Sequence, residues 1–345
     1  MTREGAALDL NDIIRDPNWL AHRYVESKDA IQFLKVPREE HARATFITED
    51  HLDPGLPRLE FDRRAAIGLA PSPAPIHFIF HSAFCCSTLL SQVFDREGLA
   101  MGLKEPAILN DTVGWRRRGA PGRNVAEVTD SALTLLARPF ATGETVIVKP
   151  SNIVNGHIRM IMALRPNAQA LFLYAPLSLF VTSVAKKGLD GRLWVRELMA
   201  GFRTDGLVQR LGFDDAALFG QTDLQIAAAG WLAQQALFAD LLPLLGDRVR
   251  TLDSETLLDD PQRAVAALAS RFGLGADEAE IADIVATSFG RNSKTGEAFG
   301  RSDREAEYAG AASAHRDEIE KVIVWAEKVA EAAAIPLDLG SRLLG

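Results

Sequence analysis

The stretch that decides the fold covers residues 76–90 and reads IHFIFHSAFCCSTLL. Its first five residues, 76–80, are apolar or aromatic apart from one histidine and favour a buried strand. Small and polar residues follow over 81–88, and apolar residues then recur at helical spacing over 89–94. The stretch therefore predicts a strand, a loop and a helix in direct succession.

Four further apolar runs are placed between segments with a helical pattern. They cover residues 99–103, 145–148, 170–174 and 248–252. Continuous apolar strands that alternate with helices are typical of a parallel sheet covered on both faces. The predicted fold class is therefore α/β, a three-layer fold with a central parallel sheet flanked by helices. The long middle region, 193–245, is predicted to be mostly helical.

The chain divides near residue 75. Residues 71–75 read PSPAP, and proline at every second position suppresses helix and marks a boundary. Before it, the sequence is helical and irregular by turns. We expect residues 1–75 to form an N-terminal extension packed on the core and residues 76–345 to form the main domain. A length of 345 residues accommodates this division.

Composition and charge exclude several classes of protein. With 47% hydrophobic and 24% charged residues, the chain is neither disordered, fibrous nor disulfide-stapled. Its 46 acidic and 38 basic residues give a net charge of -8. Such a chain lacks the long-range positive field that attracts nucleic acid or anionic lipid, so neither is expected as a partner. An anionic ligand must be bound by a local cluster of cations and backbone amides.

The cysteines and the chain ends indicate a reducing compartment. Cys85 and Cys86 are adjacent, and ordinary disulfide geometry does not join neighbours. The first fourteen residues, MTREGAALDLNDII, contain no apolar core of signal-peptide length. The apolar stretch 226–245 is interrupted by polar residues and a proline, so it predicts a buried helix and not a membrane span. A cytoplasmic location is expected, and the oligomeric state stays open.

Ligands of open parallel sheets bind beyond the carboxyl ends of the strands. The residues at those ends are 81–88, 104–105, 149–155 and 175–183. In the first of these segments, successive loop amides and the start of a helix can form a cradle for a phosphate. The alternative is that Ser87 or Thr88 only caps the helix. The segment is not a Walker A loop, because the Gly-Lys pair of that motif is missing.

Five segments follow one another in an order shared with a known family. They are AFCCSTLL at 83–90, GLKEP at 102–106, VIVKP at 146–150, the run over 171–183 and the stretch over 248–274. In this order they resemble the phosphosulfate loop, the glutamate segment, the strand ending in Lys-x-Pro, the 3′-phosphate segment and the closing stretch of the P-loop sulfotransferases. The resemblance covers about residues 76–275.

This resemblance implies a P-loop α/β fold and an activity. The family transfers a sulfuryl group from the co-substrate 3′-phosphoadenosine 5′-phosphosulfate, here to a hydroxyl or amine of a small-molecule or carrier-linked acceptor. In-line sulfuryl transfer needs a base for the acceptor and a cation on the leaving phosphate. The resemblance assigns these roles to Glu105 and Lys149, with His81 as a third catalytic candidate. No metal is required, and no His, Cys or Asp cluster has ligand spacing.

The same resemblance implies the residues that contact the donor. They lie in the loop, on the helix after the third strand of the series and in a late basic segment: Cys85, Cys86, Ser87, Thr88, Ser183, Arg291 and Lys294.

The sequence departs from the family pattern at three places. Phe84 stands where the loop cation is expected, Cys86 stands where the glycine is expected, and Tyr-Ala-Pro at 174–176 replaces Arg-Asp-Pro. Two cationic contacts to the donor are therefore absent from their usual positions, and each is worth roughly 1.5–3 kcal/mol. The candidate substitutes are His81, Arg192, Arg291, Lys294 and Arg301.

Several of these residues also have a purely structural explanation. A buried lysine at position 149 is costly unless it meets a carboxylate or a phosphate, which favours a functional role. Ser183 can bond to its own helix, and Asn152 and Asn155 can cap one. The arginines at 116–118 are either a solvated face or a site for an anionic acceptor.

Two other functions compete with sulfuryl transfer. A P-loop phosphotransferase with a magnesium nucleotide is disfavoured by the missing Gly-Lys pair and by the lack of an acidic residue at the end of 170–174. A non-catalytic descendant that binds an anion or a nucleotide is favoured by Phe84 and Tyr174, which replace cations.

Overall fold

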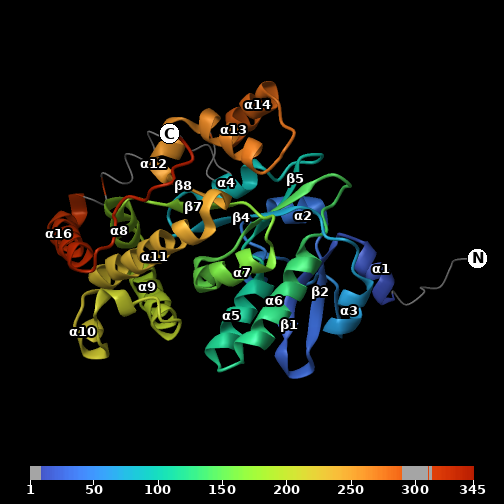
Figure 1. The fold of residues 1–345 in the computed structure, drawn as a ribbon, viewed down its shortest axis with the longest axis horizontal. Coiled ribbons are helices and arrows are strands. Elements are labelled where there is room, and N and C mark those ends of the chain that lie inside the picture. Colours follow the sequence, from blue (N-terminus) through green and yellow to red (C-terminus); the bar gives the residue numbers. More distant parts are fainter. Residues whose placement is uncertain (1–8, 290–309, 311–312) are drawn as a thin grey trace, which may run out of the picture.

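The five apolar runs form one parallel sheet in the computed structural model, which describes residues 9–289, 310 and 313–345 (Figure 1). The strand order is β5-β6-β4-β7-β8, and every neighbouring pair is parallel. The strands are β4 (Ile76–His81), β5 (Ala100–Lys104), β6 (Thr145–Lys149), β7 (Ala170–Tyr174) and β8 (Val249–Asp253). The predicted α/β class is therefore confirmed, with each strand within one residue of its predicted position.

Helices cover both faces of this sheet, which explains why its strands are continuously apolar. On one side lie α4 (Ser87–Val93), α13 (Pro261–Arg271) and α14 (Glu278–Ser288) (Figure 1). On the other side lie α5 (Ala107–Arg117), α6 (Gly122–Leu136) and α7 (Ile158–Leu164). All residues of β4, β5, β6 and β7 are buried between these layers.

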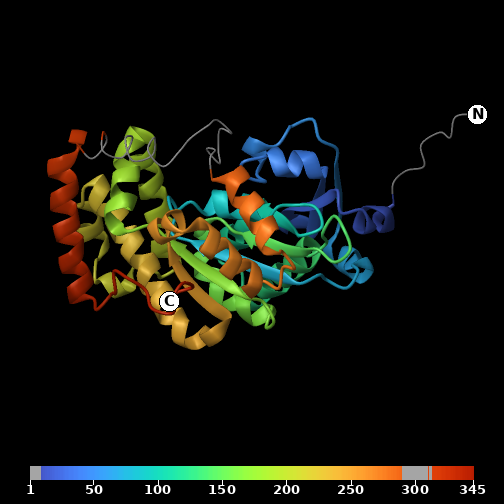
Figure 2. The ribbon, with the colours of Figure 1, turned by 90° about the horizontal axis from the view of Figure 1, so that it is seen from above.

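The middle region is helical, as predicted. It forms α8 (Leu177–Lys186), α9 (Gly188–Thr204), α10 (Asp215–Phe219) and α11 (Asp223–Leu245). With α16 (Arg316–Ala332) these helices form one end of the molecule, and the short α12 (Ser254–Asp259) follows β8 (Figure 2). Within the described ranges, no helix has the length and apolar character needed to cross a membrane.

The N-terminal residues, expected to be helical and irregular by turns, include a sheet that was not predicted. They contain a three-stranded antiparallel sheet, made of β1 (Trp19–Val25), β2 (Ala30–Lys35) and β3 (Arg58–Asp62). The sheet is accompanied by α1 (Leu10–Arg15), α2 (Arg38–Arg43) and α3 (Arg63–Leu69). The sequence of β3, RLEFD, alternates apolar and charged residues, which is a strand signal. The domain boundary at residue 75 stays a prediction.

Arg138 connects the N-terminal segment to the core. It follows α6, is only 7% exposed, and donates hydrogen bonds to the carbonyl groups of Leu135, Ile13, Ile14 and Trp19. Burial lowers its pKa to about 10. A guanidinium carries several donors in one plane, so one side chain satisfies carbonyl groups from two distant parts of the chain.

Arg138→Met is expected to destabilise the protein by about 3 kcal/mol, because it leaves several buried carbonyl groups without a donor. The measurement is urea unfolding followed by circular dichroism. Arg123→Met is the matched control, since Arg123 lies in the first turn of the same helix but its side chain is 89% exposed and pairs with Glu127 on the same helix. Equal unfolding midpoints for the two variants would contradict this role of Arg138.

Three histidines are held neutral by burial. His22 on β1 is 1% exposed, and burial lowers its pKa to about 4. His77 on β4 and His157 before α7 have the same lowered value for the same reason. In the unfolded chain each imidazole titrates near its ordinary pKa of about 6.5. The unfolded state therefore binds protons at a higher pH than the folded state, and acid favours unfolding.

The free energy of unfolding is expected to be constant above about pH 7 and to fall as the pH drops from 6.5 toward 4. For His22 alone, the loss between pH 7 and pH 5 is roughly 2 kcal/mol. Urea unfolding of His22→Gln at both pH values should show that much less pH dependence, whatever its absolute stability. His51→Gln, at an exposed position, is the control and should retain the wild-type pH dependence.

Candidate functional site

Three strand ends bring the predicted catalytic residues together. His81 ends β4, Lys149 ends β6, and Glu105 directly follows β5. The Lys149 ammonium donates a hydrogen bond to Glu105 Oε1, and the Glu105 N–H donates to the Lys149 carbonyl at 2.7 Å. His81 Nε2 lies 3.9 Å from the same Glu105 oxygen. Because β5, β6 and β4 are neighbours in the sheet, their carboxyl ends place these groups at one edge.

Lys149 is buried and has two kinds of partner. Its side chain is 1% exposed, against 18% for Glu105. Its Nζ also lies 4.7 Å from the centre of the Phe46 ring, a cation–π contact. Next to Phe46, the N–H of Ile47 donates to the Lys104 carbonyl at 2.7 Å, which fixes this segment on the end of β5. The N-terminal residues therefore form one wall of the site, and no local pattern in the sequence predicted this contact.

His81 is held as a neutral imidazole. Its Nδ1 accepts the N–H of Ala83 at 3.0 Å, so this nitrogen carries no proton. The proton then lies on Nε2, which is 3.0 Å from the Pro150 carbonyl and donates to it. In this tautomer His81 adds no positive charge to the site, so it does not replace a missing cation.

The loop after β4 has an unusual backbone. Ala83, Phe84 and Cys86 have φ angles of 72°, 52° and 62°, and Glu105 has 57°. These lie in the left-handed region that glycine adopts without strain. Cys86 thus has the conformation of the glycine that it replaces in the resembled loop. It is also the N-cap of α4 and its side chain makes no capping bond, so neither Ser87 nor Thr88 caps the helix.

A buried amide network supports the backbone of this loop. Asn155 Nδ2 donates to the His81 carbonyl at 3.0 Å, and Gln234 Nε2 donates to the Ser82 carbonyl at 3.3 Å. Gln234 Oε1 in turn accepts from Asn155 at 3.0 Å and from Asn152 at 3.3 Å. The expectation that both asparagines cap a helix was wrong, because Ser151 is the N-cap and no side chain caps there. Two polar glutamines inside the apolar stretch 226–245 were the sequence signal from which such a buried network could have been predicted.

At the two positions where cations are missing, the side chains are used for packing. The Phe84 ring lies 5.5 Å from Phe180 and 5.3 Å from Trp194, centre to centre. The Tyr174 hydroxyl donates to Asp338 Oδ1 at 2.7 Å. Neither residue offers a positive charge to a ligand.

Arg192, one of the candidate substitutes for these cations, is already ion-paired. Its guanidinium lies 2.9 Å from a carboxylate oxygen of Glu318 and 3.8 Å from one of Asp223, so its charge is neutralised within the protein. Arg291, Lys294 and Arg301 fall outside the described residues. The arginine run at 116–118 is also partly ion-paired, because Arg117 bonds to Asp205 and Arg118 to Glu26.

The remaining residues that were predicted to contact the phosphosulfate donor are buried, either near the loop or on α8. Ser87 and Thr88 are 5% and 6% exposed, and Cys85 is fully buried, which raises the pKa of its thiol to about 12. The Ser183 hydroxyl donates to the Leu179 carbonyl at 2.7 Å, the bond to its own helix that was the alternative explanation. Within the described part of the chain, no group of three or more His, Cys, Asp or Glu side chains is arranged to hold a metal.

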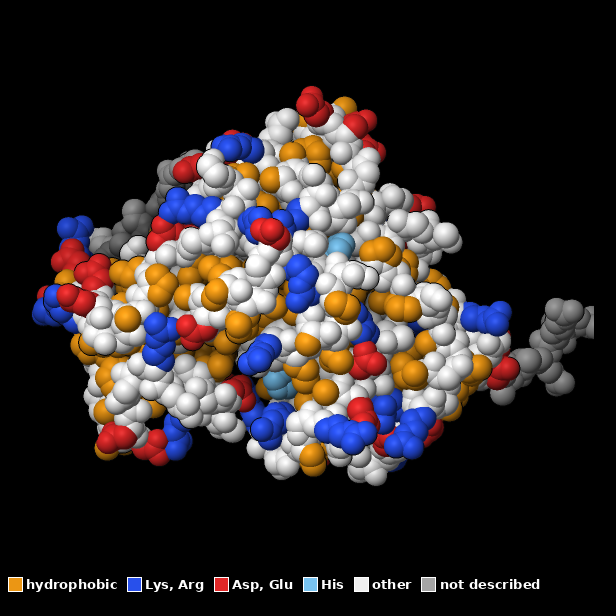
Figure 3. Space-filling model, in the orientation of Figure 1, with side chains coloured by type: hydrophobic (Ala, Val, Ile, Leu, Met, Phe, Trp, Pro, Cys, Tyr) orange, Lys and Arg blue, Asp and Glu red, His pale blue; other side chains and the backbone are white. Residues whose placement is uncertain are grey.

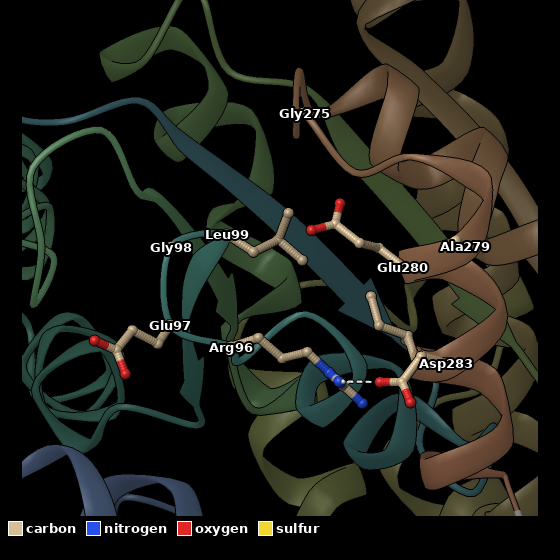
Figure 4. A pocket seen from close by; sticks show the side chains of 9 residues that line it. Arg96, Glu97, Gly98, Leu99, Gly275, Ala279, Glu280 and Asp283 are labelled. Atoms are coloured by element: carbon tan, nitrogen blue, oxygen red, sulfur yellow. Dashed lines mark hydrogen bonds and ion pairs between the residues drawn. The ribbon is translucent and has the colours of Figure 1, made fainter.

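A separate hollow lies at the opposite edge of the sheet (Figure 4). Its lining includes Arg96, Glu97 and Leu99, which precede β5, and Glu280 and Asp283 of α14. Arg96 and Asp283 form an ion pair of 2.9 Å across it. The hollow borders the amino end of β5, whereas Glu105 follows its carboxyl end. It is therefore not part of the candidate site.

Comparisons with known proteins add a likeness in fold. No family model and no curated protein matches the chain. The solved structures that are similar to it include three sulfotransferases. A sulfotransferase domain from the curacin biosynthetic pathway is 13% identical over 66% of this chain and 82% of its own, with a TM-score of 0.37. The sulfotransferase domain of the Synechococcus PCC 7002 olefin synthase is 16% identical over 77% and 97%, at 0.41. Sulfotransferase STF9 from Mycobacterium avium is 14% identical over 74% and 81%, at 0.42. At these values, the assignment of a function rests on the residues of the site.

Ala83→Gly is expected to stabilise the protein by about 1 kcal/mol, because glycine adopts the left-handed conformation of this loop position without strain. The measurement is the free energy of unfolding in urea. Ala200→Gly, at an exposed position inside α9, is the matched control and should destabilise by about the same amount. A loss of stability at both positions would show that the loop is not strained at Ala83.

Proposed function

We propose that this protein transfers a sulfuryl group from 3′-phosphoadenosine 5′-phosphosulfate to a hydroxyl or amine of a small-molecule or carrier-linked acceptor. The observation that carries the proposal is the direct contact between Lys149 and Glu105 at neighbouring strand ends, beside the loop that follows β4. The ordered series of motifs that resembles the P-loop sulfotransferases supports it. Cys85 and Cys86 are adjacent, a spacing that ordinary disulfide geometry does not join, and this suits the cytoplasmic location that the proposal includes.

The two residues serve opposite sides of the transfer. The acceptor oxygen or nitrogen forms a bond to sulfur while the bond from sulfur to the bridging phosphate oxygen breaks. Glu105 takes the proton of the acceptor as general base. Lys149 stabilises the negative charge that develops on the leaving phosphate, and its burial makes this interaction stronger than it would be in water.

The ion pair also couples donor binding to the formation of the base. In the structure described here, the ammonium of Lys149 and the carboxylate of Glu105 neutralise each other. A phosphate that binds Lys149 competes with this carboxylate. Once displaced from the ammonium, Glu105 is available to accept the proton of the acceptor. His81, fixed by Ala83 and Pro150, keeps its Nε2 within 3.9 Å of the same carboxylate.

A non-catalytic role in binding an anion or a nucleotide is the second candidate function. It is favoured by the aromatic packing of Phe84 and the bond from Tyr174 to Asp338, which replace two cations of the resembled family. Binding without turnover distinguishes this role from the proposed one.

The wild-type protein is expected to bind adenosine 3′,5′-bisphosphate, the nucleotide product, in isothermal titration without added metal. Lys149→Met should weaken this binding by about tenfold or more, because a charge-assisted hydrogen bond is lost. Glu105→Gln should retain or improve binding, since it removes the competing carboxylate. With an acceptor in hand, Glu105→Gln should lower turnover by about 10²–10⁴-fold.

Glu97→Gln, on the far edge of the sheet, is the control for loss of an acidic side chain and should behave as wild type. Unfolding curves of all variants exclude loss of fold as the cause. Absence of nucleotide binding at millimolar concentration would overturn the donor assignment. Binding of ATP only with magnesium would support a phosphotransferase in its place.

A further inference from the structure

We propose that Lys187, at the junction of α8 and α9, supplies the positive charge for the 3′-phosphate of the donor. The inference rests on the proposed function and assigns one more residue to that site. Two cations that the resembled family has at this site are missing here, and Lys187 would supply one in their place. The observations that support it are the charge balance of the edge, the position of Lys187 and the fixed geometry of its surroundings.

The charge balance leaves the edge short of a cation. Lys149 is paired with Glu105, His81 is neutral, and Arg192 is paired with Glu318. The donor carries two phosphate-bearing groups, so a single ammonium shared with a carboxylate does not balance its charge. In the face shown in Figure 3, basic and acidic side chains lie interspersed.

Lys187 reaches the loop through Phe84. Its Nζ lies 6.0 Å from the centre of the Phe84 ring, at the outer limit of a cation–π contact. The ring itself is fixed between Phe180 and Trp194. Phe84, which stands where the resembled family has a cation, therefore lies against Lys187, a cation from the end of α8.

Lys187 also lies one helical turn beyond Ser183. Its N–H bonds to the Ser183 carbonyl at 3.3 Å, so both side chains extend from the same face of α8. The Ser183 hydroxyl already donates its proton to Leu179. A phosphate accepts hydrogen bonds and donates none of importance here, so the lysine, with three N–H donors, is the better ligand of the two.

The backbone around Lys187 is fixed by close packing. A Cβ atom on Gly191 would lie 2.7 Å from the Cβ of Lys187 and 2.6 Å from the Val184 carbonyl oxygen. The first turn of α9 therefore passes directly over the end of α8. The lysine side chain is exposed, and no carboxylate within 4.0 Å pairs with it in the residues that the structure describes. Its charge is thus available for a ligand.

The test compares two nucleotides by isothermal titration, adenosine 3′,5′-bisphosphate and adenosine 5′-monophosphate, which differ only in the 3′-phosphate. Wild type should bind the bisphosphate at least about tenfold more tightly. Lys187→Met should reduce this ratio to near one and leave the affinity for the monophosphate almost unchanged. Lys187→Arg should restore most of the ratio, because it restores the charge.

Lys321→Met on α16 removes the same charge from an exposed position and should keep the wild-type ratio. If Lys187→Met also keeps that ratio, the inference is overturned and the proposed function stands. A wild-type protein that binds both nucleotides equally overturns the inference as well. If wild type binds neither nucleotide at millimolar concentration, the proposed function fails and the inference fails with it.

Discussion

The buried ion pair between Lys149 and Glu105 is the interaction on which the candidate site depends. An ammonium that is 1% exposed is costly in free energy unless an opposite charge and further contacts compensate for the lost water. Glu105 supplies the charge from the end of the neighbouring strand, and Phe46 supplies an aromatic face from the N-terminal segment. The pair therefore joins three separate parts of the chain. A ligand that replaces the Glu105 carboxylate meets an ammonium that has already lost its water during folding. The free-energy cost of removing that water is therefore not added to the cost of binding.

The rest of the edge is built from backbone groups held in place by buried side chains. Asn155 and Gln234 hold the carbonyls of His81 and Ser82, so the loop amides keep one orientation. Fixed dipoles of this kind act on an anion without reorganisation when it binds. Such dipoles would serve the proposed anion site of a chain whose net charge is -8. Its long-range field gives no help, so affinity depends on a few groups within hydrogen-bonding distance.

The sequence predicted what local patterns encode. Apolar runs identified all five strands of the parallel sheet, and the position of ligands in such sheets then identified His81, Glu105 and Lys149 as neighbours. The N-terminal sheet was missed, although the alternation in β3 was visible. Contacts between distant segments had no local signal. The cation–π contact of Phe46 with Lys149 and the pairing of Arg192 with Glu318 depend on tertiary packing, and charge alone made Arg192 look available. Residues 290–309 lie beyond what the structure tests.

The presence of Phe84 in the loop, where the resembled family has a cation, is explained by the two buried lysines at the ends of β5 and β6. Lys104 and Lys149 are aligned on neighbouring strands, and both are buried. Burial lowers the pKa of Lys104, and the positive charge of Lys149 adds to that effect. Glu105 is already paired with Lys149, so a buried cation in the loop itself would have to share this one carboxylate in a region that is poor in water. Phe84 avoids this cost and gives Lys187 a surface to lie against. The positive charge then comes from an exposed side chain, where it costs little until a ligand covers it.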